Sequence, residues 1–321
     1  MTHDDAEHRG TIQTVFADPN QDAAALHEAM QGKGCKEDEV IDVLCARSNA
    51  QRQHIAQTYE SMYGTVLRKE LKDELKGDFE DLMLALMETP ARYDAQQLHD
   101  AMKGLGTKES VLIEIICSRS SEELHAIQQE YHMLFEKSLV HELEKELSGD
   151  LKRLLVLLCT NVRHESNRIK IRKGNEDAEE LYKTTLHKEE SRFAEMLATQ
   201  SFAQLRVVFC AYGKFVSHDI QEDVEEQFSG DAKTAYLAIV RCVKNRPAYF
   251  AERLHHSMKG FGTKDADLIR VVVSRSEIDM VAIKREYRRM FEKTLESAIE
   301  TECSGNYKKA LIALVIGNEQ F

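Results

Sequence analysis

The stretch MKGFGTKDADL, residues 258–268, places two glycines two residues apart and then a run typical of a helix. A glycine-rich turn that leads into a helix often holds a phosphate group. The residues before this turn are not a strand, because Phe250, Leu254 and Met258 recur every four residues, as on one helix face. Neither GxGxxG nor GxxxxGK[ST] is present in it. The turn therefore joins two helices and is not a nucleotide-phosphate loop of the usual kind.

The same stretch recurs as MKGLGTKES at 102–110 and, altered, as MQGKGCKED at 30–38. In each copy an arginine follows the methionine by 17 residues, at Arg47, Arg119 and Arg275. A further glycine lies 30 residues beyond that position in four places, at Gly77, Gly149, Gly230 and Gly305. The third of the four copies has Gln200 in place of the arginine and lacks the loop. Repeats of this period indicate four related structural units.

Each unit is predicted to be helical. A serine with a polar partner three residues later is typical of a capping box at a helix start. The pairs are Ser48 with Gln51, Ser120 with Glu123, Ser201 with Gln204, and Ser276 with Asp279. No stretch alternates apolar and polar residues long enough to predict a strand, and three prolines in 321 residues suit a helix-rich chain. We expect an all-α fold.

Charge and composition exclude several function classes. The formal net charge of −12 disfavours nucleic acid, and it disfavours an anionic membrane unless a cation intervenes. The seven cysteines form no CxxC pair, and Cys45 and Cys117 lie in apolar runs, so we expect buried free thiols. The sequence has no HExxH and no GxSxG motif, and we expect no enzyme activity. The N-terminus has no apolar signal region, which favours a cytoplasmic protein.

The loops carry a pattern that suits a hard metal ion. Glycines let successive carbonyl oxygens turn toward one point, and Ca²⁺ takes roughly six to eight oxygens, usually including a carboxylate. A glutamate lies 44 residues after each loop methionine, at Glu74, Glu146 and Glu302. The third copy has Gln227 at that position and no glycine in its loop region. A single glutamate could be an ordinary surface charge, but three matched pairs and one joint loss favour metal coordination.

With these motifs, residues 20 to 317 resemble the annexin family. The resemblance implies five helices per repeat, four repeats in a curved disc, and Ca²⁺ as the bound metal. It implies that backbone carbonyls and one carboxylate form three sites, from Met30, Gly32, Gly34 and Glu74; from Met102, Gly104, Gly106 and Glu146; and from Met258, Gly260, Gly262 and Glu302. Cys35 replaces the usual threonine and Lys33 separates the glycines of the first loop, which puts the affinity of that site in question.

The resemblance also implies roles for residues outside the metal sites. Leu105 and Phe261, at the loop tips, are candidates for membrane contact, and the alternative is that each folds back on its own repeat. Asp94, Arg119 and Arg270 match the central polar channel of annexins, although Gln97 stands where an acid is usual. Buried ion pairs that fix helix packing are the alternative to ion conduction.

The expected layout is an N-terminal tail at 1–18, four repeats and one linker. The repeats are at 19–89, 90–161, 178–245, with the degenerate loop, and 246–321, and the linker is at 162–177. The expected function is calcium-dependent binding to anionic phospholipid membranes, by a cytoplasmic protein that becomes peripheral when calcium rises or reaches the cell surface by unconventional export. The alternative is a calcium-independent scaffold that binds a protein partner through the tail.

Overall fold

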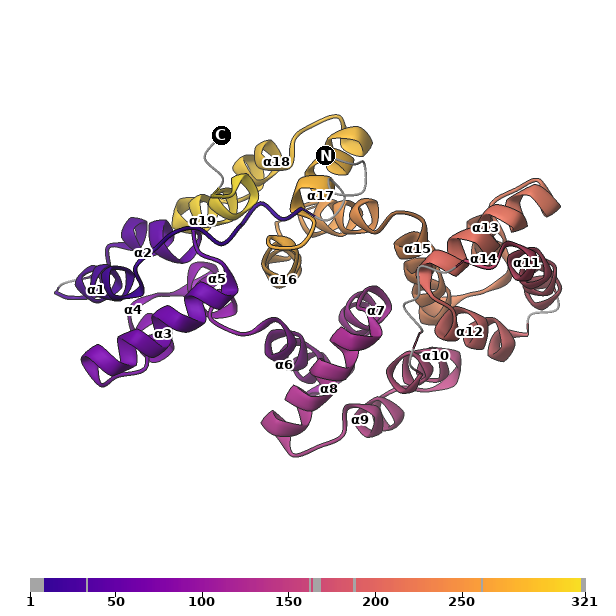
Figure 1. Cartoon of the computed structure of the whole chain (residues 1–321), viewed down its shortest axis with the longest axis horizontal. Coiled ribbons are helices and arrows are strands. Elements are labelled where there is room, and N and C mark those ends of the chain that lie inside the picture. The colour runs from indigo at the N-terminus through magenta and orange to yellow at the C-terminus, as the bar shows by residue number, and fades with distance from the viewer. Residues whose placement is uncertain are drawn as a thin grey trace. The chain divides into compact units, whose positions relative to one another are not determined.

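The computed structural model describes the chain in six stretches, residues 9–32, 34–161, 163, 169–186, 189–260 and 262–318. These stretches contain nineteen helices and no strand (Figure 1), which confirms the predicted all-α fold. The helices form two compact units. The first consists of the described residues up to Pro90 and from Pro247 on, and the second of Ala91–Arg246.

The first unit combines helices from both ends of the sequence. Its helices are α1 (Pro19–Ala29), α2 (Glu37–Leu44), α3 (Asn49–Tyr63), α4 (Leu67–Glu74), α5 (Gly77–Leu86), the end of α15 (Gly230–Ser257), α16 (Asp265–Arg275), α17 (Met280–Phe291), α18 (Leu295–Glu302) and α19 (Gly305–Ile316). Helix α5 packs against α16, and α19 packs against α2 and α5, so the first and last repeats share one core. Figure 1 shows the yellow α19 beside the indigo and purple helices.

The second unit is continuous in sequence. Its helices are α6 (Pro90–Met102), α7 (Glu109–Ser118), α8 (Ser121–Phe135), α9 (Leu139–Glu146), α10 (Gly149–Thr160), α11 (Ile171–Leu186), α12 (Glu190–Thr199), α13 (Phe202–Val216), α14 (Ile220–Gln227) and the first part of α15. Helix α10 packs against α12, and α11 lies along α13. This unit therefore joins the second and third repeats.

Helix α15 contains a sharp bend. Asn245 has extended φ and ψ of −159° and 91°, and Pro247, two residues later, has no backbone N–H to continue the helical ladder. If α15 is counted as two helices, each quarter of the chain has five. Beyond the bend Phe250, Leu254 and Met258 are all buried, as their spacing predicts.

Three of the four serine positions begin helices as predicted. Complete capping boxes are formed by Ser48 with Gln51 and by Ser120 with Glu123. Ser201 accepts a hydrogen bond from the backbone N–H of Gln204 at 3.1 Å, but the Gln204 side chain bonds to Lys170 instead of completing the box. These caps satisfy N–H groups that a helix start leaves open.

The prediction that Ser276 begins a helix is wrong. Helix α17 begins at Met280, with Asp279 as its N-cap residue, and Ser276 follows the end of α16. In repeats 1 and 2 the anchor arginine binds an aspartate 25 residues earlier, in the pairs Arg47–Asp22 and Arg119–Asp94. Repeat 4 has Phe250 at that position. Arg275 therefore lies over the Phe250 ring, 4.5 Å from its centroid, and binds Asp279 at 2.6 Å instead.

Residues 9–15 form an extended segment, the N-terminal strap, along the first unit. The Thr11 hydroxyl donates to the Leu314 carbonyl at 2.6 Å, and Ile12 is buried. Asn318 donates from its backbone N–H to the Thr11 carbonyl at 3.2 Å. Gln51, in repeat 1, donates to the Val15 carbonyl at 2.7 Å. The strap thus connects the first repeat to the last.

Candidate functional site

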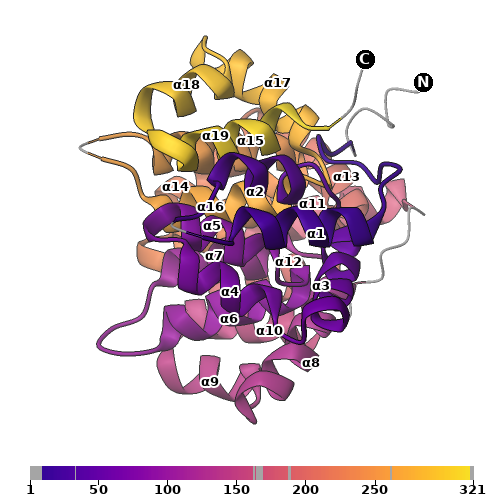
Figure 2. The same ribbon diagram turned by 90° about the vertical axis from the view of Figure 1, so that its left-hand side faces the viewer.

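Three loops of the same form join the first two helices of repeats 1, 2 and 4. Their glycines have positive φ: +106° and +91° at Gly32 and Gly34, +105° and +86° at Gly104 and Gly106, and +119° and +83° at Gly260 and Gly262. A Cβ added at any of these glycines would meet no atom within 4 Å. Glycine is required here by the backbone conformation and not by crowding. Figure 2 shows the loop between α6 and α7 extending away from its helices.

Each loop is closed by one backbone hydrogen bond of the same register. The lysine before the second helix donates to the carbonyl of the residue before the loop methionine. The bonds run from Lys36 to Ala29 at 2.8 Å, from Lys108 to Ala101 at 2.8 Å, and from Lys264 to Ser257 at 2.7 Å. The methionines Met30, Met102 and Met258 are buried, so each loop starts from a fixed point in the core.

The predicted carboxylates occupy one structural position. Glu74, Glu146 and Glu302 are the last residues of the eight-residue helices α4, α9 and α18, and Gln227 ends the matching helix α14. In repeat 1 the charge of Glu74 affects the pKa of a residue next to the loop. Burial, followed by the carboxylates of Glu37, Glu74 and Glu39, raises the pKa of the Cys35 thiol to about 11. Cys35 directly follows Gly34, so the negative charge of Glu74 acts on a residue at the end of the first loop.

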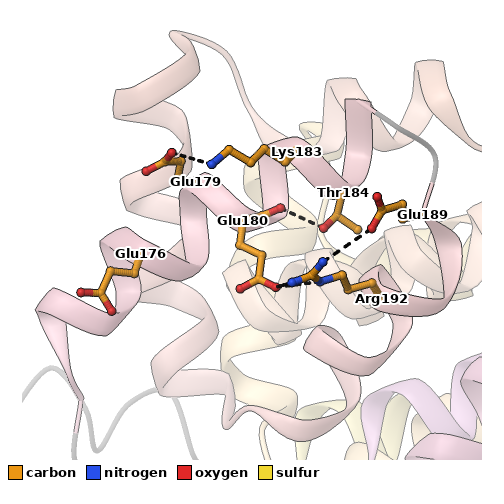
Figure 3. A pocket seen from close by; sticks show the side chains of 7 residues that line it. All are labelled: Glu176, Glu179, Glu180, Lys183, Thr184, Glu189 and Arg192. Carbon is orange, nitrogen blue, oxygen red and sulfur yellow. Dashed lines mark hydrogen bonds and ion pairs between the residues drawn. The ribbon is translucent and has the colours of Figure 1, made fainter.

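Repeat 3 has side-chain ion pairs where the other repeats have the loop. Residues around the end of α11 line a cavity of about 450 Å³ (Figure 3): Glu176, Glu179, Glu180, Lys183, Thr184, Glu189 and Arg192. Arg192 donates to Glu180 at 2.7 Å and lies 3.8 Å from a Glu189 oxygen. Lys183 lies 2.7 Å from Glu179. Three of the four acids that line this cavity thus pair with Lys183 or Arg192, and Glu176 pairs with Arg172.

A histidine stacks beside each glycine loop, and the sequence prediction missed it. His27, His99 and His255 each lie three residues before the loop methionine. Their rings stack on Tyr63, Phe135 and Phe291, with centroids 3.8, 3.8 and 3.9 Å apart and planes within 9° of parallel. Repeat 3 has Tyr182 instead, in an edge contact with Phe215 at 72°. The sequence did contain a signal for it, because the histidine is present only in the three repeats that have both the loop and the glutamate.

Of the two membrane-contact candidates, Leu105 is among the described residues. Leu105 is fully exposed, so it does not fold back on its own repeat. Phe261 lies outside the described residues.

The channel candidates form ion pairs within two different units. In the second unit Arg119 binds Asp94 through two hydrogen bonds, at 2.7 and 3.1 Å. In the first unit Arg270 donates to Asp267 at 2.7 Å. Arg119, Asp94 and Arg270 are all buried, whereas Asp267 is partly exposed and lies on the same helix as Arg270.

The described residues contain no group of three or more histidine, cysteine or acidic side chains arranged to hold a metal. None of the helices in the described stretches has the length and apolar character needed to cross a membrane.

Comparisons with known proteins agree with this arrangement of loops and helices. The Annexin family model matches residues 21–86, 93–158, 176–239 and 249–314. The chain is 42% identical to annexin A11 of Oryctolagus cuniculus over 97% of its own length, and it spans 63% of that relative. The solved structure of annexin III is similar with a TM-score of 0.94 at 40% identity, covering 98% of this chain and 99% of the other. A calcium-bound annexin (Sm)1 is similar with a TM-score of 0.87 at 31% identity, covering 96% and 93%. The chain belongs to the annexin family.

Proposed function

We propose that this protein binds Ca²⁺ in the loops of repeats 1, 2 and 4 and, in that state, binds anionic phospholipid membranes. The annexin family is known for calcium-dependent phospholipid binding. The observation that carries the proposal is internal to the chain. Repeats 1, 2 and 4 share a closed loop with two positive-φ glycines and a glutamate at a helix end, and repeat 3 lacks both the loop and the glutamate.

The residues present fit a hard cation with oxygen ligands. The carbonyls of each loop methionine and its two glycines would supply three oxygens, and Glu74, Glu146 or Glu302 would supply the carboxylate. Ca²⁺ takes roughly six to eight oxygens, so positions would remain for water and for lipid oxygens. The first loop differs from the others at two positions. Cys35 stands where repeats 2 and 4 have Thr107 and Thr263, and Lys33 stands where they have Leu105 and Phe261.

Charge explains why a cation is required at the membrane. The chain carries a formal net charge of −12, so an anionic surface repels it over distances of about 10 Å at ordinary salt. A bound Ca²⁺ would supply positive charge between the loop and a lipid phosphate. Several loops acting together would raise the avidity by on the order of a hundredfold. Membrane organisation, trafficking or repair, by a cytoplasmic protein recruited when calcium rises, is the corresponding role.

The test is co-sedimentation with phosphatidylserine vesicles, with calcium and with a chelator. We expect pelleting only with calcium, and none with phosphatidylcholine vesicles. Equal pelleting in both conditions would favour the rival function, a calcium-independent scaffold that uses the tail at 1–18. In the described part of this tail, the strap residues 9–15 are bound to their own chain.

A further inference from the structure

The histidine beside the first loop begins a chain of hydrogen bonds that leads to the helix of the predicted calcium ligand. His27 Nδ1 lies 3.0 Å from the Tyr59 hydroxyl oxygen. The Tyr59 hydroxyl donates in turn to Glu70. His27 is three residues before Met30, and Glu70 is four residues before Glu74. The chain therefore connects the end of α1, where the loop starts, with α4, where the acid stands.

The direction of these hydrogen bonds follows from counting protons. Hydrogen bonds from Thr65 and Tyr59 lower the pKa of Glu70, so this carboxylate is ionised and can only accept. The single hydroxyl proton of Tyr59 is then used toward Glu70. Its oxygen accepts the Nδ1 proton of His27, which fixes the tautomer of the imidazole. The face of the imidazole is fixed as well, since it stacks on Tyr63 at 3.8 Å.

Residues four apart on a helix lie on one face, so Glu70 and Glu74 share a face of α4. A group that holds Glu70 also sets the position of the helix turn that carries Glu74. Tyr59 is suited to this task because its side chain is fully buried. Because its packing restricts its movement, it keeps a fixed distance between His27 at the end of α1 and Glu70 on α4.

We infer that His27 and Tyr59 are positioning residues of the first calcium site, which hold the Glu74 carboxylate at a fixed place relative to the loop at 30–34. This inference rests on the proposed function. Groups outside a coordination shell that orient its ligands commonly change metal affinity by about 10–100-fold when removed.

The other repeats show graded versions of the same link. In repeat 2 the His99 Nδ1 lies 3.3 Å from the Tyr131 hydroxyl, and burial, followed by Glu142 and Glu146, raises the pKa of Tyr131 to about 12. In repeat 4 Ala298 occupies the position of Glu70, and the Tyr287 hydroxyl is buried without a hydrogen-bond partner. The link is therefore complete in repeat 1, partial in repeat 2 and absent in repeat 4.

Repeat 3 provides the matched control. The Tyr212 hydroxyl donates to Asp223, which lies four residues before Gln227, so the tyrosine–carboxylate bond is kept where loop and acid are missing. His218 also binds Asp223, at 2.6 Å, from the side of the following turn. Tyr59→Phe and Tyr212→Phe thus remove the same atom from the same structural position, once beside a proposed site and once not.

The experiment uses the full chain with Glu146 and Glu302 both changed to glutamine, which leaves the first site alone. Calcium binding is measured by calorimetry, and the melting temperature is measured in chelator. We expect one bound Ca²⁺, a dissociation constant raised about tenfold by Tyr59→Phe, and no change with Tyr212→Phe. His27→Asn, whose amide can replace the Nδ1 donor, should retain more affinity than His27→Phe, which keeps only the ring.

The outcomes separate the inference from the proposed function. Absence of calcium binding to the parent variant would overturn the assignment of the first site itself. Normal binding by both the parent and Tyr59→Phe would overturn only the positioning role. Equal loss of affinity in Tyr59→Phe and Tyr212→Phe would also overturn it, because the effect would then be a general loss of stability.

Discussion

The Asp94 carboxylate accepts two hydrogen bonds from the Arg119 guanidinium, from Nε at 2.7 Å and from Nη2 at 3.1 Å, with both side chains almost completely buried. The same spacing gives the more exposed pair Asp22–Arg47 in repeat 1. In repeat 3 Gln200 donates to Asp177, 23 residues earlier, at 3.0 Å, and Lys173 lies 3.0 Å from the same carboxylate. The pair therefore connects the first helix of a repeat to the start of its third.

Asp94→Asn should destabilise the protein by about 3–5 kcal/mol, because it leaves the Arg119 charge buried without a counter-charge. Asp22→Asn is the matched control. It should cost clearly less, since the Arg47 side chain is 20% exposed and can reach water. Chemical denaturation of both variants checks this, and equal losses would show that burial of the pair does not set its contribution.

Glu146→Gln should weaken calcium binding in repeat 2 by about tenfold or more, because calcium affinity follows the number of charged ligands. The helix should remain intact, as the side chain is partly exposed and pairs only with Lys145. Glu144→Gln, two residues earlier on α9, removes the same charge from an exposed position and should leave affinity unchanged. Calorimetry in a Glu74→Gln, Glu302→Gln background resolves the difference. Similar affinities for the two variants would remove Glu146 from the site.

Repeat 3 should bind no calcium in its loop region, and Gln227→Glu alone should not create a site. The added carboxylate would face a segment without the glycines that let carbonyls converge. Crystals grown with calcium should show ions in the loops of repeats 1, 2 and 4. An ion held by the backbone between Lys183 and Lys188 would contradict the prediction.

Leu105→Asn should raise the calcium concentration needed for half-maximal vesicle binding while leaving calcium affinity without lipid unchanged. The Leu105 side chain is fully exposed in the structure, so its only large gain is burial in the membrane interface, worth about 2 kcal/mol. Met133→Gln changes an exposed apolar residue on α8 and serves as the control. A vesicle titration that is the same for both variants would rule out the contact.

Gly10→Ala should release the N-terminal strap and cost about 1–3 kcal/mol. A Cβ at this position would lie 2.3 Å from the carbonyl carbon of Glu277, which belongs to a backbone that cannot move freely. Gly213→Ala is the control, because its nearest neighbour would be 3.5 Å away and helix propensity favours alanine. Thermal unfolding that ranks the two variants the other way would show that the strap is not tightly held.

Periodic features of the sequence predicted the fold well because each has a local physical cause. Gly77, Gly149, Gly230 and Gly305 each begin the last helix of a repeat with φ between +61° and +63°. Glycine adopts this conformation easily, whereas it is costly for other residues. The glycine found 30 residues after each anchor therefore marks the start of a helix.

Long-range contacts account for what the sequence did not predict. Ser276 fits the capping pattern, but its partner Asp279 is bound by Arg275, because Phe250 stands where repeats 1 and 2 have the aspartate that binds this arginine. The loop glycines could be recognised one by one, whereas the link from His27 through Tyr59 to Glu70 joins three helices. His27 and Glu70 are 43 residues apart, and no local pattern connects them.

The division of the chain has a consequence for synthesis on the ribosome. The second unit is complete once residue 246 has emerged, and its contacts are local in sequence. Repeat 1 is synthesised first, but it shares its core with repeat 4. The apolar faces of α2 and α5 therefore stay exposed until α16 and α19 have been synthesised. Repeat 1 is therefore the first repeat to be synthesised and among the last to complete its fold. In a circular permutant that starts at Ala91 and ends at Pro90, with the original ends joined, each unit would be continuous in sequence. We expect this permutant to refold faster, because the contacts within the first unit become more local in sequence.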